Sequence, residues 1–433
     1  MIVKIFFLVD FFVCLFLFLM EYSNLSVLMY ITTFTTAMSL YNIFTIYNFR
    51  LSLSSVILLY TIVTQFGLII PYYYIGSFTV SEYEYWTLEF LENKYLIPAI
   101  LIGNIAIISY EISRLFIVKQ SCGKDEVNIQ KHNVHKKKKI YNISTSLLIL
   151  VVIYFVYFIF LGGTTLFGSY GDFNESSLRK NFLYPFILIM FYLGSLYLST
   201  CGDIKSNKLG WILWILIASL FALNGNKGEF LYPLLAILGL KGVQGTKTSL
   251  QTIVFIAFIM FIAIPTITAL RGLGLVSNLS NASTSLYSGF VEIGMQLRTS
   301  VYTLEFLDIG TINFLYGQSY WQPILNIITP FMDHDVAAFQ LKVELNGFGY
   351  NQVIESYLNF GIIGVILFFG LLGGVMCMFE NKYARDEIKL AFLGSITCTL
   401  LNATRNYFAF VPGHVLVAYI FYLLIKKYAL QNK

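Results

Sequence analysis

The sequence predicts an all-α, polytopic membrane protein with about twelve transmembrane helices and one long external loop that carries an amphipathic helix. Of the 433 residues, 57% are hydrophobic and only 12% are charged. A soluble domain has about 45–50% apolar and about 25% charged residues. Half the usual charge cannot cover a soluble globule of this size, so the composition excludes soluble enzymes, nucleic-acid-binding modules and secreted domains.

Apolar runs mark the expected helices, because a helix needs about 20 residues to cross the hydrocarbon core. They fall near 2–20, 25–47, 52–75, 95–118, 141–161, 182–200, 209–223, 229–241, 250–270, 352–378, 389–402 and 411–427. The first run has no obvious small-residue cleavage site, so we expect a membrane helix there rather than a removed signal. We expect residues 1–433 to form a single integral membrane domain.

The distribution of basic residues predicts the orientation of these helices. The segment 119–140 is rich in Lys, and the positive-inside rule makes it a cytoplasmic loop rather than a nucleic-acid-binding patch. Alternation from this loop places both termini in the cytoplasm and most of the 28 Lys and Arg residues on the same side. The basic residues expected outside are Lys94, Arg179, Lys180, Lys227, Arg271, Arg298, Lys342 and Arg405.

The longest external loop spans 271–351 and shows helical periodicity. Its apolar residues recur on one face at Leu286, Phe290, Ile293, Leu297, Val301 and Leu304. Arg298 and Glu305 share a neighbouring face, so we expect an amphipathic helix that lies along the outer membrane surface. A long structured loop on one side of such a protein is more often functional than a connector.

Two helical hairpins are too short in their apolar parts. The stretches 210–223 and 229–240 cover only ~21 Å and ~18 Å at 1.5 Å per residue, against a ~30 Å core. The tip 224–229 must therefore lie below the headgroups or in a wet cavity. The last hairpin repeats this pattern, and its tip 402–414 contains Arg405.

Four external basic residues are candidates for ligand binding: Lys227, Arg271, Arg298 and Arg405. For each alone, snorkelling to lipid phosphate or pairing with an acid such as Glu229 is the simpler interpretation. For all four together, a shared anionic ligand is favoured, and a lipid-linked phosphate or pyrophosphate is the natural anion at that depth. Charge-assisted contacts of this kind contribute ~1.5–3 kcal/mol each.

Two residues are candidates for a general base. Glu355 lies at the outer start of the tenth apolar run, where a helix-start acid and a catalytic carboxylate are equally good interpretations. His334 stands in Asp333-His334-Asp335, which suits a loop residue best, a general base next and a metal site least. We therefore expect no metal site. Glu111 and Arg114 are three residues apart and are expected to form a structural pair on one helix face.

Five strings occur in a recognisable order: GNKGEFLYPLL (225–235), LRGLG (270–274), FVEIGMQLRTSV (290–301), YGQSYWQPILNIITP (316–330) and GYNQVIESYLNFGIIG (349–364). Together they resemble the O-antigen polysaccharide polymerase (Wzy) family of bacterial inner-membrane proteins. That family is similar in architecture to the GT-C integral membrane glycosyltransferases and to O-antigen ligases.

The resemblance implies a function on the outer (periplasmic) face of the inner membrane. Such polymerases transfer a growing glycan from undecaprenyl pyrophosphate to a new lipid-linked repeat unit, without a metal, nucleotide or other cofactor. The implied partners are the undecaprenyl-pyrophosphate-linked oligosaccharide, membrane lipid and a polysaccharide chain-length regulator. Lys227 stands where relatives often have Arg, a change that keeps the charge but loses the bidentate fork.

This reaction assigns roles to the candidate residues. Fixed cations must stabilise the departing pyrophosphate; Arg271 is the first choice, followed by Arg298, Arg405 and Lys227. The acceptor hydroxyl must lose a proton to a base, and Glu355 is preferred over His334. Alternative functions are an O-antigen ligase, which typically has a His at the base position, a lipid-linked oligosaccharide flippase or transporter, and an inert scaffold or sensor.

Overall fold

The computed structural model describes residues 2–46, 49–75, 88–117, 134–163, 175–201, 207–224, 226–249, 251–252, 255, 258, 289–291, 294–329 and 350–430. Within these ranges, every regular element is a helix. The elements are α1 (Ile2–Leu19), α2 (Leu25–Ile46), α3 (Leu53–Phe66), α4 (Ile69–Ile75), η1 (Glu89–Glu92), α6 (Leu96–Ile117), α7 (Val134–Phe160), α9 (Ser177–Lys180), α10 (Tyr184–Thr200), α11 (Lys208–Leu223), α12 (Lys227–Val243), α16 (Gln296–Asp308), α17 (Gln318–Ile328), α19 (Gln352–Tyr383), α20 (Glu387–Thr404) and α21 (Phe410–Leu430).

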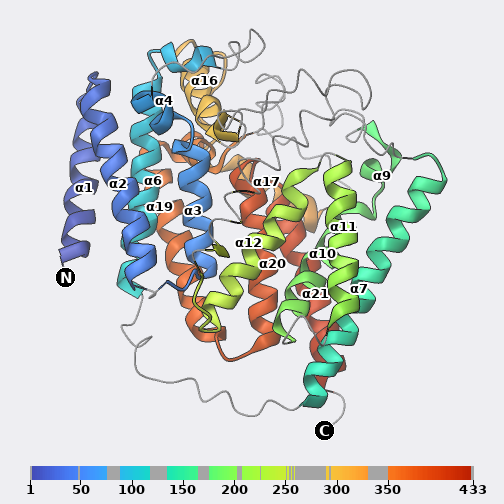
Figure 1. The fold of residues 1–433 in the computed structure, drawn as a ribbon. Helices are drawn as coiled ribbons and strands as arrows, with labels where there is room; N and C mark the ends of the chain where they lie inside the picture. Colours follow the sequence, from blue (N-terminus) through green and yellow to red (C-terminus); the bar gives the residue numbers. More distant parts are fainter. Residues whose placement is uncertain are drawn as a thin grey trace.

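The long helices run side by side between two ends of a bundle, and α1 begins at the end where α21 stops (Figure 1). Helices occupy the predicted apolar runs, except that most of 250–270 lies outside the described residues. By length and composition, five helices of the described part of the chain are able to cross a membrane, namely α2, α6, α7, α19 and α21, and the pair of α3 and α4, bent by 48°, is either a broken sixth span or a re-entrant loop. The all-α membrane fold is therefore confirmed, while the count of about twelve spans stays a prediction.

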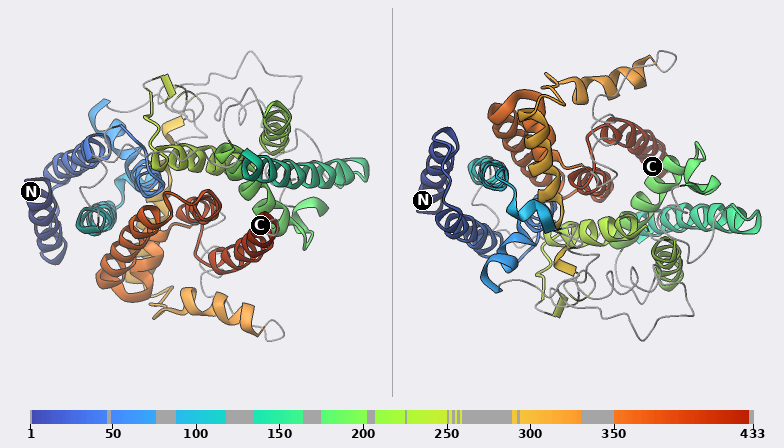
Figure 2. Two further views of the ribbon diagram at one scale, coloured as in Figure 1. Left: turned by 90° about the horizontal axis from the view of Figure 1, so that it is seen from below. Right: turned by 90° about the horizontal axis from the view of Figure 1, so that it is seen from above.

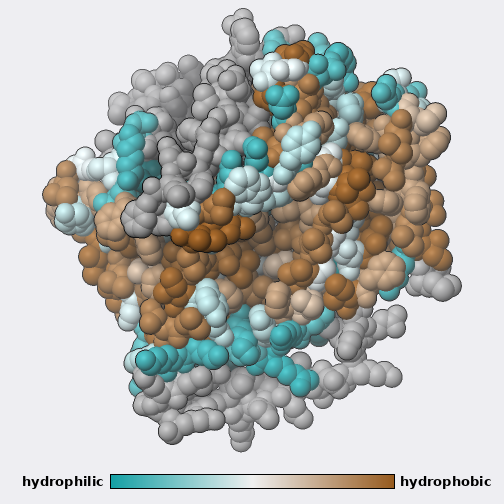
Figure 3. Space-filling view, turned by 180° about the vertical axis from the view of Figure 1, so that it is seen from behind, coloured by the Kyte–Doolittle hydropathy of each residue, from teal (hydrophilic) through white to brown (hydrophobic). Residues whose placement is uncertain are grey.

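Basic residues separate between the two ends of the bundle. Figure 3 shows an apolar belt above a polar rim, and the rim lies at the end that contains both termini. Described basic residues expected in the cytoplasm lie at the ends of helices there, namely Lys208, Lys241, Lys382, Lys389, Lys426 and Lys427. Lys94, Arg179, Lys180, Lys227, Arg298 and Arg405 lie at the opposite end, which we call the outer end.

Close packing of α12 on the start of α3 depends on glycine. A Cβ atom on Gly242 would lie 1.7 Å from the Leu51 carbonyl oxygen, and one on Gly239 would lie 2.9 Å from Leu53 Cα. A side chain at either position would force the two backbones apart. This approach brings the outer part of α12 beside α3 and α20, where several predicted site residues lie.

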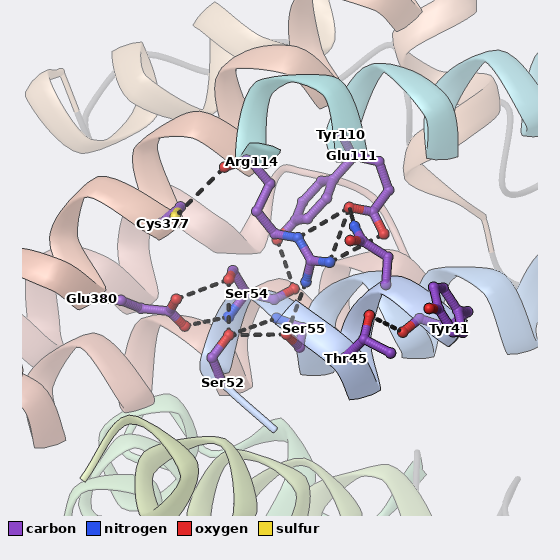
Figure 4. A network of polar contacts seen from close by, with 11 residues as sticks. Tyr41, Thr45, Ser52, Ser54, Ser55, Tyr110, Glu111, Arg114, Cys377 and Glu380 are labelled. Atoms are coloured by element: carbon purple, nitrogen blue, oxygen red, sulfur yellow. Dashed lines mark hydrogen bonds and ion pairs between the residues drawn. The ribbon is translucent and has the colours of Figure 1, made fainter. Parts of the chain in front are cut away.

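A buried polar network joins α2, α3, α6 and α19 away from the outer end (Figure 4). Arg114 donates from Nε and Nη2 to the Glu111 carboxylate at 3.1 Å each, and from Nη1 to Ser55 Oγ at 2.8 Å. Both members of the ion pair are buried, with 1% and 0% of the side chains exposed. Glu380 accepts hydrogen bonds from the backbone N–H of Ser54 and, at 2.8 Å, from Ser54 Oγ. The predicted Glu111–Arg114 pair is therefore confirmed, and its role is to hold helices together.

The predicted amphipathic helix of the external loop corresponds to α16, but it does not lie along a surface. It packs against α3, α6 and α19, and its polar residues Arg298, Thr299 and Ser300 are buried along with Leu297 and Val301. The expected surface location is wrong because the polar face of α16 packs within the protein. Of the six residues that defined the predicted face, Leu286 and Ile293 lie outside the described residues.

The helix α19 is broken near its outer end. Phe360 (φ −145°, ψ 28°) and Gly361 (φ 60°, ψ −151°) are not helical, and Gly361 adopts its positive φ because it has no Cβ. The break isolates a two-turn outer segment, residues 352–359, which contains Glu355. The Leu358 carbonyl oxygen at the break accepts a hydrogen bond from the Leu315 N–H at 2.8 Å.

Candidate active site

The structure describes four of the six predicted site residues. Glu355, Arg405, Lys227 and Arg298 all lie at the outer end of the bundle. Arg271 and His334 lie outside the described residues, so their roles stay predictions.

Glu355 is fully buried in the outer segment of α19. Its Oε2 accepts a hydrogen bond from the Phe408 N–H at 2.9 Å, and Ser319 of α17 lies beside the carboxylate. Its Oε1 accepts no hydrogen bond of standard geometry within the described part of the chain, although the Ser319 hydroxyl is close to the carboxylate, and the nearby Tyr350 hydroxyl is buried and also unpartnered there. Buried polar atoms almost always have partners, so an unpartnered carboxylate oxygen indicates a place for water or a substrate hydroxyl.

Side chains fix the short helical segment on both sides of Glu355. Before it, Asn351 caps α19 and donates to the Gln296 carbonyl oxygen at 2.7 Å and to Ser300 Oγ at 3.0 Å, both on α16. After it, Asn359 donates to Ser319 Oγ and to the Glu355 carbonyl oxygen, each at 2.8 Å. The carboxylate is therefore preorganised although it sits beside a helix break.

Arg405 ends α20 and lies three residues before Phe408, whose N–H binds Glu355. It lies close enough to Tyr60 of α3 and Tyr232 of α12 to interact electrostatically with both. The two tyrosine rings pack edge-to-face, with centroids 6.0 Å apart. The turn 405–408 thus carries a cation toward α3 and α12, and a backbone donor toward the acid on α19.

A second buried acid, Glu229, lies on α12 at the same outer end of the bundle. Its carboxylate accepts from Tyr192 Oη at 2.5 Å and from Asn226 Nδ2 at 3.2 Å. Arg179 acts on the same carboxylate and lies over the Tyr184 ring, 4.6 Å from its centroid.

The sequence suggested Glu229 only as an acid that could pair with one of the four candidate basic residues, and Arg179 was not among them. The signal for Arg179 was present, because it is one of the few basic residues expected outside.

Lys227 is the first residue of α12 and is half-buried, two positions before Glu229. Arg298 is buried in α16, where burial lowers its pKa to about 10. Arg298 therefore remains a cation at neutral pH. At the tip of the α11–α12 hairpin, Asn224 is 1% exposed and Glu229 is 5% exposed, while the residues 226–228 between them are half-buried. The depth of this tip in the membrane stays a prediction.

Within the described residues, no group of three or more His, Cys, Asp or Glu side chains could hold a metal ion. The Asp333-His334-Asp335 string lies outside them.

The comparisons with known proteins identify the same family that the five sequence strings suggested. The family model for "O-antigen polysaccharide polymerase Wzy" matches residues 1–433. The chain belongs to this Wzy family. Protein CapE of Staphylococcus aureus is similar, with 25% identity over 394 residues that cover 88% of this chain and 86% of CapE. No solved structure matches. As a member of this family, the chain is a multi-pass membrane polysaccharide polymerase that acts on lipid-linked oligosaccharide.

Proposed function

We propose that this polymerase transfers a growing glycan from undecaprenyl pyrophosphate to a new lipid-linked repeat unit on the periplasmic face of the bacterial inner membrane. The observation that supports this most is the position of Glu355. A buried carboxylate with one unpartnered oxygen stands beside a turn that also carries Arg405. Both termini would then be cytoplasmic, and a chain-length regulator would be a protein partner.

In the proposed step, Glu355 is the general base. Its Oε1 accepts the proton of the acceptor hydroxyl while that oxygen forms a bond to the anomeric carbon of the donor sugar. The bond from this carbon to the pyrophosphate oxygen breaks, and the electron pair leaves with the pyrophosphate. A positioned base contributes about 10²–10⁴-fold to the rate of such a step.

Cations at the outer end would stabilise the charge on the leaving pyrophosphate. We assign this role to Arg405 among the described residues, because the same turn carries it and the donor to Glu355. Lys227 and Arg298 lie at the same end, and Arg271 completes the proposed set. Because such cations are fixed before the reaction, they need not reorganise as charge develops.

Complementation of a deletion strain tests this function. The gene is deleted in its host and restored as wild type, Glu355→Gln or the matched control Glu380→Gln, with membrane levels equalised and the surface glycan examined on a gel. Glu380 serves as the control because it is also a buried carboxylate of α19, but lies near the end of that helix farthest from Glu355. We expect a ladder with wild type and Glu380→Gln, and single repeat units with Glu355→Gln.

Other outcomes would identify the alternatives. Loss of all glycan on deletion, including the single unit, would indicate a ligase or a flippase and overturn the proposal. A normal ladder from Glu355→Gln would keep the polymerase but remove Glu355 as its base.

A further inference from the structure

The helix α17 lies across the bundle rather than along it. In both views along the bundle axis, α17 is seen lengthwise and projects from one side, whereas most of the long helices, the strongly tilted α7 excepted, are seen closer to end-on (Figure 2). Its buried residues are Ser319 and Pro323, while Trp321, Ile324 and Ile328 are exposed at three- and four-residue steps. Such spacing places these three side chains on one face. The helix therefore has an inner and an outer face of different character.

The inner face of α17 covers the segment that contains Glu355. Ser319 Oγ accepts from Asn359 at 2.8 Å and lies beside the Glu355 carboxylate. The Tyr320 ring stacks on Phe368 of α19, with centroids 5.5 Å apart, and meets Phe408 edge-to-face at 5.1 Å. One face of α17 thus belongs to the proposed active site.

The outer face of α17 continues an apolar stripe on α19. Ile363, Leu367 and Leu371 are exposed at four-residue steps along the helix, and the exposed Phe360 lies at the break just before them. On a 32-residue apolar helix, such a stripe faces hydrocarbon. The Phe360 ring joins the stripe to α17, because a Cβ on Gly317 would lie 2.9 Å from Phe360 Cζ.

Hydrocarbon is the occupant that this surface fits. The exposed residues of 318–328 include no charged side chain, and Trp321 is of the type that settles at the membrane interface. An amphipathic helix in this orientation buries its apolar face at the boundary between headgroups and acyl chains. The opposite face of the same helix, only about 10 Å away, lies beside Glu355.

We propose that α17 and the adjoining outer part of α19 form the lateral path by which the substrate approaches. The polyisoprenoid chain of the lipid-linked saccharide lies along Trp321, Ile324, Phe360 and Ile363. Its pyrophosphate and sugars reach past α17 to Glu355. This inference rests on the proposed function, because it locates the lipid portion of the same substrate.

Photo-crosslinking tests the path independently of turnover. Benzoylphenylalanine replaces Ile324, Ile363 or, as a matched control, Ile215 of α11, an exposed isoleucine on the opposite side of the bundle. The full chain is placed in nanodiscs of phosphatidylethanolamine and phosphatidylglycerol with tritiated undecaprenyl pyrophosphate and irradiated. We expect about tenfold more labelling at 324 and 363 than at 215, a preference of about 1.4 kcal/mol. Excess unlabelled undecaprenyl pyrophosphate should remove this labelling, and an equal excess of cardiolipin should not.

Equal labelling at the three positions, or labelling that the unlabelled lipid does not remove, would overturn the proposal. So would crosslinks at 324 to a second copy of the chain or to a partner protein, since either would make the surface a protein interface. The two experiments distinguish failure of the path from failure of the proposed function. Specific labelling in nanodiscs, together with a ladder in the host that does not depend on this gene, would keep the path and reject the proposed function.

Discussion

Removing Arg114 should destabilise the protein strongly, because its guanidinium makes three hydrogen bonds in a site without solvent. Two of these bonds go to Glu111 and one goes to Ser55. In Arg114→Leu, the Glu111 carboxylate keeps only the bond from Asn42 at 2.9 Å, and one oxygen loses its donor. Leaving one charge of a buried pair without its partner costs about 3–5 kcal/mol. We expect a loss of this size in the free energy of unfolding.

Reversible unfolding in mixed micelles, followed by tryptophan fluorescence, would measure this loss. Glu111→Gln combined with Arg114→Leu should recover part of it, because neither member of the pair is left as an unpartnered charge and the amide oxygen still accepts from Asn42. Arg385→Leu is the control, since Arg385 is an exposed basic residue at the end of the bundle opposite the outer end. A loss below about 1 kcal/mol for Arg114→Leu, or a double variant as unstable as the sum of the single ones, would refute the reasoning.

Three further predictions concern the outer end and the helix packing. Arg405→Ala should lower the rate of polymerisation by about 10²–10³-fold, and Arg405→Lys should restore part of it because the charge is kept; initial rates with lipid-linked repeat units would show this. Glu229→Gln should keep the acceptor for Tyr192 but remove the charge that faces Arg179, so hydrogen exchange at Arg179 should increase while the core of α12 stays protected. Gly242→Ala should destabilise by about 1–3 kcal/mol, because its Cβ would overlap the Leu51 carbonyl; Gly413→Ala, with open space around its Cβ, should have no such effect in the same unfolding assay.

Hydropathy was sufficient to predict where most helices lie. A helix in the hydrocarbon core must be apolar along most of its length, so the local sequence alone indicates where such a helix lies. The Glu111–Arg114 pair was predictable for a similar reason, because three residues separate its members on one helix.

Features that depend on packing between distant segments were not predictable in this way. The polar residues of α16 suggested a surface helix, yet Ser300 is buried against Asn351, 51 positions away. The break at Phe360–Gly361 lies within the apolar run 352–378, which hydropathy shows as a single helix. The amphipathic helix α17 was not predicted, and Pro323 within it is atypical of a helix interior.

The position of Glu355 against the turn that contains Arg405 could be anticipated only in part. Both residues were selected as polar residues at the outer boundary, and in the structure Glu355 binds Phe408 of the turn 405–408, while Arg405 of the same turn interacts with Tyr60. No side chain in the sequence indicates that the Phe408 N–H binds the Glu355 carboxylate, because any residue except proline supplies the same backbone donor at that position.

The bond between Ser54 and Glu380 also affects how the chain is made. These residues are 326 positions apart. At a synthesis rate of about 5–20 residues per second, Glu380 is added roughly 16–65 s after Ser54. The Glu111–Arg114 pair forms within one helix and can shield its own charges as soon as α6 leaves the translocon. Nascent chains that stop before α19 should therefore insert their early helices but leave Ser54 in the first turn of α3 without its carboxylate acceptor.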